Sequence, residues 1–310
     1  MLEDTGERYI PDPADAHYEH PHRYLSARRF ATGRRVVDLA SGEGYGASWL
    51  ADVAASVVGL DIADDAVRHA TARYVGQHPN LRFARAVVER LPIADGSVEL
   101  VTCFEAIEHV HDPKTVTDEI ARVLAPGGVA IISTPNKRVH TDEKGIRNPF
   151  HFSEMYLPEF DALLRSSFET VAMVGQRTIA ASWIWPLDRQ DKERSEFLVA
   201  PELRGLPRTD AALEPMYAVA YCANGRTDLP NELAETSLFL DRELTLLGYY
   251  DRAAAAVRGM HALRESVARA DQRVARAEAE LAAVHASKVM RYTSGLRRVY
   301  GTLRRRFLRG

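Results

Sequence analysis

Short apolar runs rich in Val and Ile alternate with longer amphipathic segments between residues 35 and 132. Strands repeat every two residues and helices every 3.6, so this alternation predicts βαβ units on a parallel sheet. Two later runs would complete a seven-stranded sheet of the doubly wound α/β class. The predicted strands are 35–39, 56–61, 81–84, 98–104, 129–133, 168–175 and 216–222, with helices that begin near Gly46, Asp64 and Lys114.

The composition shifts to Ala, Arg and Glu near residue 251, and neither Pro nor Gly occurs between His261 and Ser294. We therefore predict one long helix. Its apolar residues recur at alternating steps of three and four, the seam of a coiled coil that would join copies of the chain. A helix lying back on the α/β domain is the alternative. The seam residues are Met260, Leu263, Val267, Ala270, Val274, Ala277, Leu281 and Val284.

The chain accordingly divides into four predicted parts. Residues 1–225 form the α/β domain, and the poorly periodic stretch 178–215 within it is a lid or a substrate-facing insertion. Residues 226–250 form a linker, 251–285 a coiled coil and 286–310 a basic amphipathic tail.

Charge and apolar content indicate where the protein works. The net charge is −3, but residues 288–310 hold eight Lys or Arg and no acid, which leaves −11 on the rest. The polar start resembles no secretory signal, no run reaches the roughly 20 apolar residues of a membrane span, and the two cysteines are far apart. We expect a cytoplasmic protein whose tail contacts the inner face of the membrane peripherally. The alternatives for the tail are a solvated basic end or an RNA-contacting arm.

A glycine-rich turn follows the first predicted strand in VVDLASGEGYG (36–46). Gly42 and Gly44 let the backbone approach a ligand and offer amide donors at a helix start. The next strand ends in VGLDI (58–62), which places the Asp61 carboxylate at a strand tip some 20 residues further on. A ribose diol needs such an acceptor, so the two features together predict a nucleoside-binding site. A helix N-cap is the alternative role for Asp61.

These stretches, with LPIADGSVEL (91–100) and LAPGG (124–128), resemble the class I S-adenosylmethionine-dependent methyltransferases over roughly residues 20–222. The resemblance implies S-adenosylmethionine as cofactor and a Rossmann-like fold. EHPHRY (19–24) is similar to the segment that closes over the cofactor, where Arg23 could pair with its carboxylate or lie on a solvated helix face. Val87 departs from the family, which often has Asp there for the adenine amino group. The implied cofactor-binding residues are Arg23, Asp38, Ala40, Gly42, Gly44, Asp61, Ile62, Val88, Glu89 and Phe104.

The fourth predicted strand runs into CFEAIEHVHDP (103–113). If the chain turns helical at Glu105, then Glu105, Glu108 and His109 share one helix face. His151, after the fifth strand, returns to the same carboxyl edge of the sheet, where open α/β sheets bind ligands. Oxygen donors with imidazole suit Mg²⁺ or Mn²⁺, so these four residues are the predicted metal ligands. In the metal-free alternative, Glu108 or His109 only shapes the pocket, and His109 or His111 acts as the general base.

The Glu-x-x-Glu-His pattern with a later His resembles small-RNA 3′-terminal 2′-O-methyltransferases, and its first part resembles quinone O-methyltransferases. GERYIP (6–11), with the run from STPN (133–136) through NPFH (148–151) to Glu159 and Phe160, resembles bacterial methyltransferases encoded with surface-polysaccharide glycosyltransferases. That resemblance implies a sugar hydroxyl of a glycan as the acceptor. A terminal RNA ribose or a lipid or quinone phenol is the alternative, and the −11 charge outside the tail disfavours nucleic acid. A non-enzymatic scaffold is a further alternative, opposed by the intact glycines and Asp61.

Overall fold

The computed structural model describes residues 18–145, 147–178, 214–225, 245–286 and 288–307. The chain forms two compact units, Met1–Leu240 and Asp241–Gly310, which are described separately. Most of the predicted insertion (178–215) and linker (226–250) lies outside the described residues.

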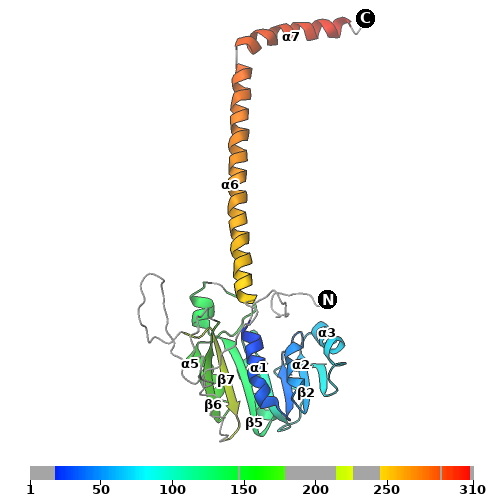
Figure 1. The fold of residues 1–310 in the computed structure, drawn as a ribbon, viewed down its shortest axis with the longest axis vertical. Coiled ribbons are helices and arrows are strands. Elements are labelled where there is room, and N and C mark those ends of the chain that lie inside the picture. The colour runs from blue at the N-terminus through cyan, green and yellow to red at the C-terminus, as the bar shows by residue number, and fades with distance from the viewer. Residues whose placement is uncertain (1–17, 146, 179–213, 226–244, 287, 308–310) are drawn as a thin grey trace, which may run out of the picture. The chain divides into compact units, whose positions relative to one another are not determined.

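A seven-stranded sheet lies at the centre of the first unit (Figure 1), in the order β3-β2-β1-β4-β5-β7-β6. The first five strands are parallel. Strand β7 pairs antiparallel with both β5 and β6. The predicted seven-stranded α/β fold is therefore confirmed. The strands are β1 (Arg35–Leu39), β2 (Ser56–Asp61), β3 (Leu81–Arg85), β4 (Val98–Phe104), β5 (Leu124–Pro135), β6 (Thr170–Gln176) and β7 (Tyr217–Ala223).

Helices cover both faces of the sheet, because alternate residues of each strand enter different cores. In β1, Val36 belongs to one core and Val37 to the other. The first core includes side chains of α1 (Glu19–Ala31), α2 (Tyr45–Ala51) and α3 (Asp64–Tyr74). The second includes side chains of α4 (Pro113–Val123) and α5 (Leu157–Arg165). The two cysteines are free and buried.

Side-chain capping fixes where α4 and α5 begin. The Asp112 carboxylate accepts a hydrogen bond from the Lys114 amide at 3.1 Å, and Pro113 follows at the first helical position. Before α5, the Glu159 carboxylate accepts from the Tyr156 amide at 2.9 Å. These starts set the lengths of the loops that bring functional side chains to the carboxyl edge of the sheet.

The second unit consists of α6 (Thr245–Ala286) and α7 (Lys288–Phe307). The predicted long helix is confirmed and begins six residues earlier than expected. Its seam residues Met260, Leu263 and Val274 are 54%, 65% and 56% exposed in the single chain, and pairing with another copy stays a prediction. Among the described residues, no helix combines the length and apolarity that a membrane crossing needs.

Candidate active site

The glycine turn after β1 uses left-handed backbone conformations at three alternate positions. Ala40, Gly42 and Gly44 have φ of 52°, 53° and 94°. Glycine adopts this region freely, but Ala40 does so at a cost of roughly 1–2 kcal/mol. A Cβ at Gly44 would lie 2.6 Å from Ala70 Cβ. Gly44 is thus needed for packing on α3 as well as for the turn into α2.

Asp61, at the tip of β2, ties this turn in place. Its Oδ2 accepts from the Gly42 amide at 2.8 Å and its Oδ1 from the Ala63 amide at 2.9 Å. The N-cap of α3 is Ala63, so the helix-cap alternative for Asp61 is wrong. Each carboxylate oxygen retains acceptor capacity. Ile62 beside it is 61% exposed, and an apolar surface next to an acceptor suits a nucleoside.

Three other predicted cofactor-binding residues are Val88 and Glu89, which follow β3, and Phe104, which ends β4. Val88 is half-buried against the core and Glu89 is half-buried beside it. Phe104 is 6% exposed and packs edge-on against Tyr24, with ring centroids 5.0 Å apart. We therefore assign Phe104 to packing.

Asp38 is also in the core, fully buried in β1 and paired with Thr102 of β4. Its Oδ1 accepts from Thr102 Oγ1 at 2.6 Å, and both oxygens accept from the Tyr24 hydroxyl at 3.2 Å. Burial raises the pKa of this carboxyl from 3.8 to about 7. These hydrogen bonds join β1 to β4 and α1 in the core, and we assign Asp38 no direct contact with a ligand.

Arg23 is buried in α1, so the alternative of a solvated helix face is wrong. Its Nη1 lies 2.9 Å from Glu105 Oε1, and its Nε donates to Gln176 Oε1 at 2.6 Å. The guanidinium carbon stands 4.6 Å from the centroid of the Tyr217 ring. Its buried Nη2 has no hydrogen-bond partner among the described residues, which suits a ligand carboxylate.

Glu105 corrects the sequence prediction. Its φ is 50°, so no helix begins there, and a 3₁₀ turn, η1 (Ile107–His109), follows instead. The Glu105 carboxylate accepts from Ser133 Oγ at 2.7 Å and pairs with Arg23. Its interactions therefore differ from those expected of a fourth metal ligand.

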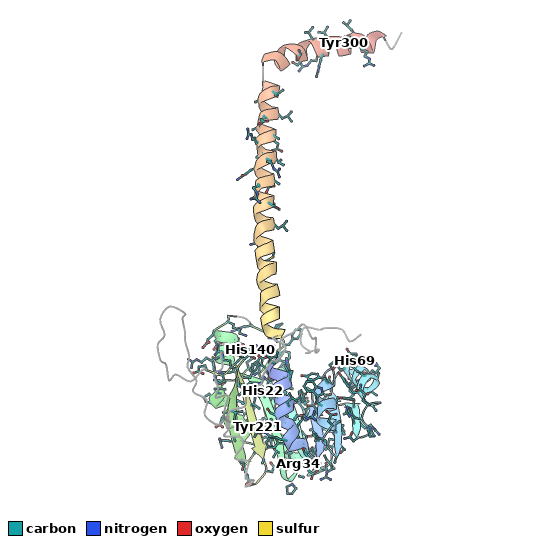
Figure 2. The ribbon with its side chains drawn as sticks, in the orientation of Figure 1. His22, Arg34, His69, His140, Tyr221 and Tyr300 are labelled. Carbon is teal, nitrogen blue, oxygen red and sulfur yellow. The ribbon has the colours of Figure 1, made fainter. Side chains whose placement is uncertain are left out.

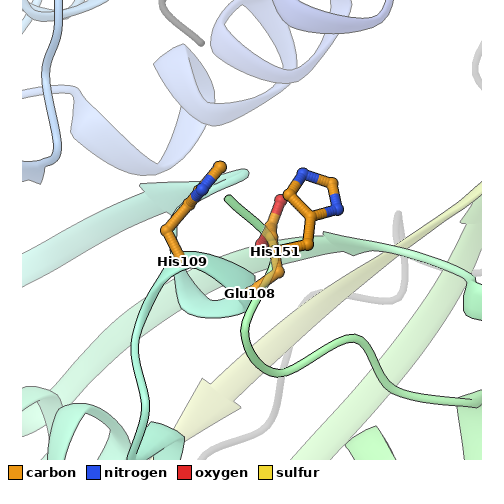
Figure 3. Close-up of side chains that lie close together, drawn as sticks. All are labelled: Glu108, His109 and His151. Carbon is orange, nitrogen blue, oxygen red and sulfur yellow. The ribbon is translucent and has the colours of Figure 1, made fainter. Parts of the chain in front are cut away.

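The other three predicted ligands do come together. Ligand atoms of Glu108, His109 and His151 lie within 4.8 Å of one another (Figure 3), and the two rings have centroids 4.9 Å apart. The Phe152 and Ser153 amides donate to the Glu108 carbonyl oxygen at 2.8 and 3.0 Å. These bonds fold the loop after β5 onto η1 and so bring His151 to residues more than 40 positions earlier.

Glu108 is 1% exposed, and its Oε2 accepts from Thr134 Oγ1 at 3.2 Å. Its buried Oε1 has no hydrogen-bond partner within the described part of the chain. Burial, followed by the charge of Glu105, holds the pKa of Glu108 well above its usual range. A carboxylate in this position needs a proton or a cation to become stable.

A second group was not foreseen. Ligand atoms of His140, His151 and Glu154 also lie within 4.8 Å of one another. His140 comes from a π-turn, η2 (Arg138–Asp142), at the end of the sheet toward which β5 runs (Figure 2). The position of His140 shortly after β5 was the only feature of the sequence that could have placed it at this site. His111 belongs to neither group, because it is exposed and stacks on Phe152 at 4.3 Å.

Comparison with known proteins identifies the family. The Methyltransferase domain family matches residues 37–132. A probable S-adenosylmethionine-dependent methyltransferase of Mycolicibacterium smegmatis is 38% identical over 176 residues, which cover 55% of this chain and 67% of that protein. The chain belongs to the S-adenosylmethionine-dependent methyltransferases.

Other methyltransferases match as well. A probable S-adenosylmethionine-dependent methyltransferase of Mycobacterium tuberculosis, Rv3030, is 37% identical over 55% of this chain and 63% of its own length. A ubiquinone biosynthesis O-methyltransferase of Albidiferax ferrireducens is 38% identical over 34% of this chain and 42% of its own. A solved S-adenosylmethionine-dependent methyltransferase from Mesorhizobium loti aligns with 67% of this chain and 98% of that one, at 18% identity and a TM-score of 0.46.

The family membership names the nucleoside as S-adenosylmethionine, as the sequence predicted. The chain's residues fit this methyltransferase cofactor, because Asp61 offers diol acceptors next to the glycine turn and Arg23 has a buried, unused donor. Direct contacts by Ala40, Gly42 and Gly44 stay predictions.

Proposed function

We propose that this methyltransferase transfers a methyl group to oxygen, and that the acceptor is a sugar hydroxyl of a glycan or glycolipid. In such a transfer the bond from methyl carbon to sulfonium sulfur breaks, the carbon–oxygen bond forms and the hydroxyl proton leaves. The site must therefore promote loss of that proton. The proposal rests on the cluster of Glu108, His109 and His151 at the carboxyl edge, because a cation or a histidine base held there would promote loss of the proton.

We assign a divalent cation, Mg²⁺ or Mn²⁺, to this cluster. Glu108 Oε1 is buried without a hydrogen-bond partner among the described residues, and two imidazoles lie within 4.8 Å of its ligand atom. A buried carboxylate left unpaired is costly, and a cation would compensate it. When bound, a divalent cation lowers the pKa of a nearby hydroxyl by several units. In the metal-free alternative a histidine takes the proton, and His109 is favoured over the exposed His111.

Support for oxygen as the acceptor atom comes from the ubiquinone biosynthesis O-methyltransferases, which match about a third of this chain. Support for a sugar comes from the resemblance to polysaccharide-associated methyltransferases and from the −11 charge outside the tail, which is unfavourable for binding a phosphate backbone.

The test is methyl transfer from isotopically labelled cofactor to separate glycan, lipid and RNA fractions, with and without EDTA. We expect label in glycan or glycolipid, loss of turnover in EDTA and recovery with Mg²⁺ or Mn²⁺. Glu108→Gln should lower turnover roughly 1000-fold, since the cation's contribution is several kcal/mol. Cofactor affinity should change little, because the hydrogen bonds of Glu108 go to Thr134 and to the loop after β5, whereas those of Asp61 go to the glycine turn and Ala63.

His111→Ala is the matched control, because it removes an exposed imidazole two residues from His109 and outside the cluster. Its turnover should stay near wild type. Full activity in EDTA would overturn the cation assignment, and label confined to RNA or to a phenolic lipid would overturn the sugar.

We further propose that two copies pair through α6 and that α7 lies on an anionic membrane surface. In α7, Leu296, Val299 and Tyr300 are 70%, 58% and 71% exposed and follow helical spacing. Arg297 and Arg298 between them are also exposed. Each cation near anionic headgroups contributes on the order of 1 kcal/mol, and pairing would present two tails together.

A further inference from the structure

His151 is held by a buried carboxylate that belongs to neither the glycine turn nor η1. Its Nδ1 lies 2.7 Å from Glu154 Oε1, and the two side chains are only 7% and 11% exposed. A carboxylate accepts hydrogen bonds, so a neutral His151 must carry its proton on Nδ1 to make this contact. Nε2 is then the nitrogen with the lone pair.

Thr141 fixes the carboxylate in turn. Its hydroxyl donates to the same Glu154 oxygen at 2.7 Å, and the residue is 6% exposed. Thr141 belongs to η2, the π-turn that follows β5. The chain Thr141, Glu154, His151 therefore links the turn after β5 to the cluster, with each member oriented by the one before it.

His109 has the same arrangement on the opposite side of the cluster. Its Nδ1 lies 3.1 Å from the Phe150 carbonyl oxygen, which can only accept, so a neutral His109 also places its lone pair on Nε2. In Figure 3 the His109 and His151 rings stand on either side of Glu108. Two imidazoles of matched tautomer thus accompany the Glu108 carboxylate.

We propose that Glu154 is a positioning residue that fixes the orientation and tautomer of His151, so that the Nε2 lone pair is presented to Glu108 and His109. A histidine ligand or base needs this lone pair, and a hydrogen-bonded carboxylate behind the ring commonly supplies the orientation. The binding of a cation by His151 rests on the proposed function. The protonation of His151 on Nδ1 does not depend on it.

The first test measures the tautomer in the metal-free, full-length protein by ¹⁵N NMR with labelled histidine, His151 being assigned by its absence in His151→Gln. We expect wild type to show Nδ1 protonated and Nε2 bare. Glu154→Ala should give mixed tautomers, whereas Glu154→Gln should keep the wild-type pattern because the amide oxygen still accepts. Thr141→Val should give a smaller fraction of the second tautomer. This variant keeps the side-chain volume at position 141 and leaves both His151 and Glu154 in place.

The second test titrates Mn²⁺ into the same proteins by electron paramagnetic resonance. Glu154→Ala should bind roughly 10- to 100-fold more weakly, the usual effect of losing such a partner, and Glu154→Gln should stay close to wild type. Glu159→Ala is the control, because it removes another hydrogen-bonded carboxylate, at the start of α5, that bonds Tyr156.

The outcomes separate the two proposals. An Nε2-protonated His151 in wild type, an unchanged tautomer in Glu154→Ala, or a Gln variant that behaves like the Ala variant in both tests would overturn the positioning role. Equal loss of Mn²⁺ in the Ala and Gln variants would make Glu154 a ligand instead. Absence of Mn²⁺ binding by wild type, with the tautomers as expected, would overturn the cation and leave Glu154 in its role.

Discussion

Replacing Asp38 with Asn should change how the stability of the first unit depends on pH. Asp38 is fully buried, and burial raises the pKa of its carboxyl from 3.8 to about 7. The folded state therefore holds this proton more tightly than the unfolded state does. Its stabilising contribution is complete below about pH 4 and is lost as the pH rises through 7.

The magnitude follows from the size of the pKa change. Each pKa unit corresponds to about 1.4 kcal/mol, so ionising Asp38 in the folded protein costs about 4 kcal/mol in all. About 3 kcal/mol of this stabilising contribution is lost between pH 5 and pH 8. Asn cannot ionise, and its amide oxygen can still accept from Thr102. The free energy of unfolding of wild type minus that of Asp38→Asn should therefore fall by about 3 kcal/mol over this range.

The assay is urea unfolding at pH 5, 6, 7 and 8, at one ionic strength, followed by intrinsic tryptophan fluorescence. All three tryptophans precede residue 240, so the signal reports the first unit. Glu99→Gln is the control, because Glu99 is a solvent-exposed carboxylate on the neighbouring strand β4, and its difference from wild type should not fall as the pH rises. A difference between wild type and Asp38→Asn that stays constant with pH would refute the reasoning.

Two further predictions follow from the site and the tail. Asp61→Asn should weaken cofactor binding by at least 100-fold in calorimetry, and wild-type affinity would contradict this. The same variant should destabilise the fold by roughly 1–3 kcal/mol, because the carboxylate accepts hydrogen bonds from the Gly42 and Ala63 amides. A chain ending at Ala286 should remain a dimer in sedimentation but stop floating with anionic liposomes at low salt; flotation equal to that of the full chain would reject α7 as the membrane contact.

The strands could be predicted from sequence because their signal is local. The bounds of β1, β2 and β4 agree with the β-branched runs that predicted them. Strand β5 is longer than expected, since Pro126 to Gly128 indicate a turn but lie within a strand that shifts register against β4. Helix α5 was not predicted, because nine residues give too short a pattern to distinguish from loop.

The site could be predicted where topology alone places residues. Loops that follow parallel strands meet at one edge, which is why Glu108, His109 and His151 converge as expected. Glu105 was predicted wrongly because its left-handed backbone accompanies contacts with Arg23 and Ser133, which come from α1 and β5. Glu154 was missed because its partner Thr141 lies on a π-turn, for which the sequence carries no periodic signal.

Because β6 pairs directly with β7, the segment that connects these two strands can be replaced by another sequence. Gln176 and Tyr217 are direct partners in the ladder, and the Met216 amide donates to the Gln176 carbonyl oxygen at 3.0 Å. The chain thus leaves and rejoins the sheet at one point, so a tight turn grafted between these residues would keep every strand in register. Shortening the connection should even gain about 2 kcal/mol of loop-closure entropy. Tyr217, at which the chain rejoins the sheet, lies against Arg23 and His140, so the point of exchange adjoins the active site.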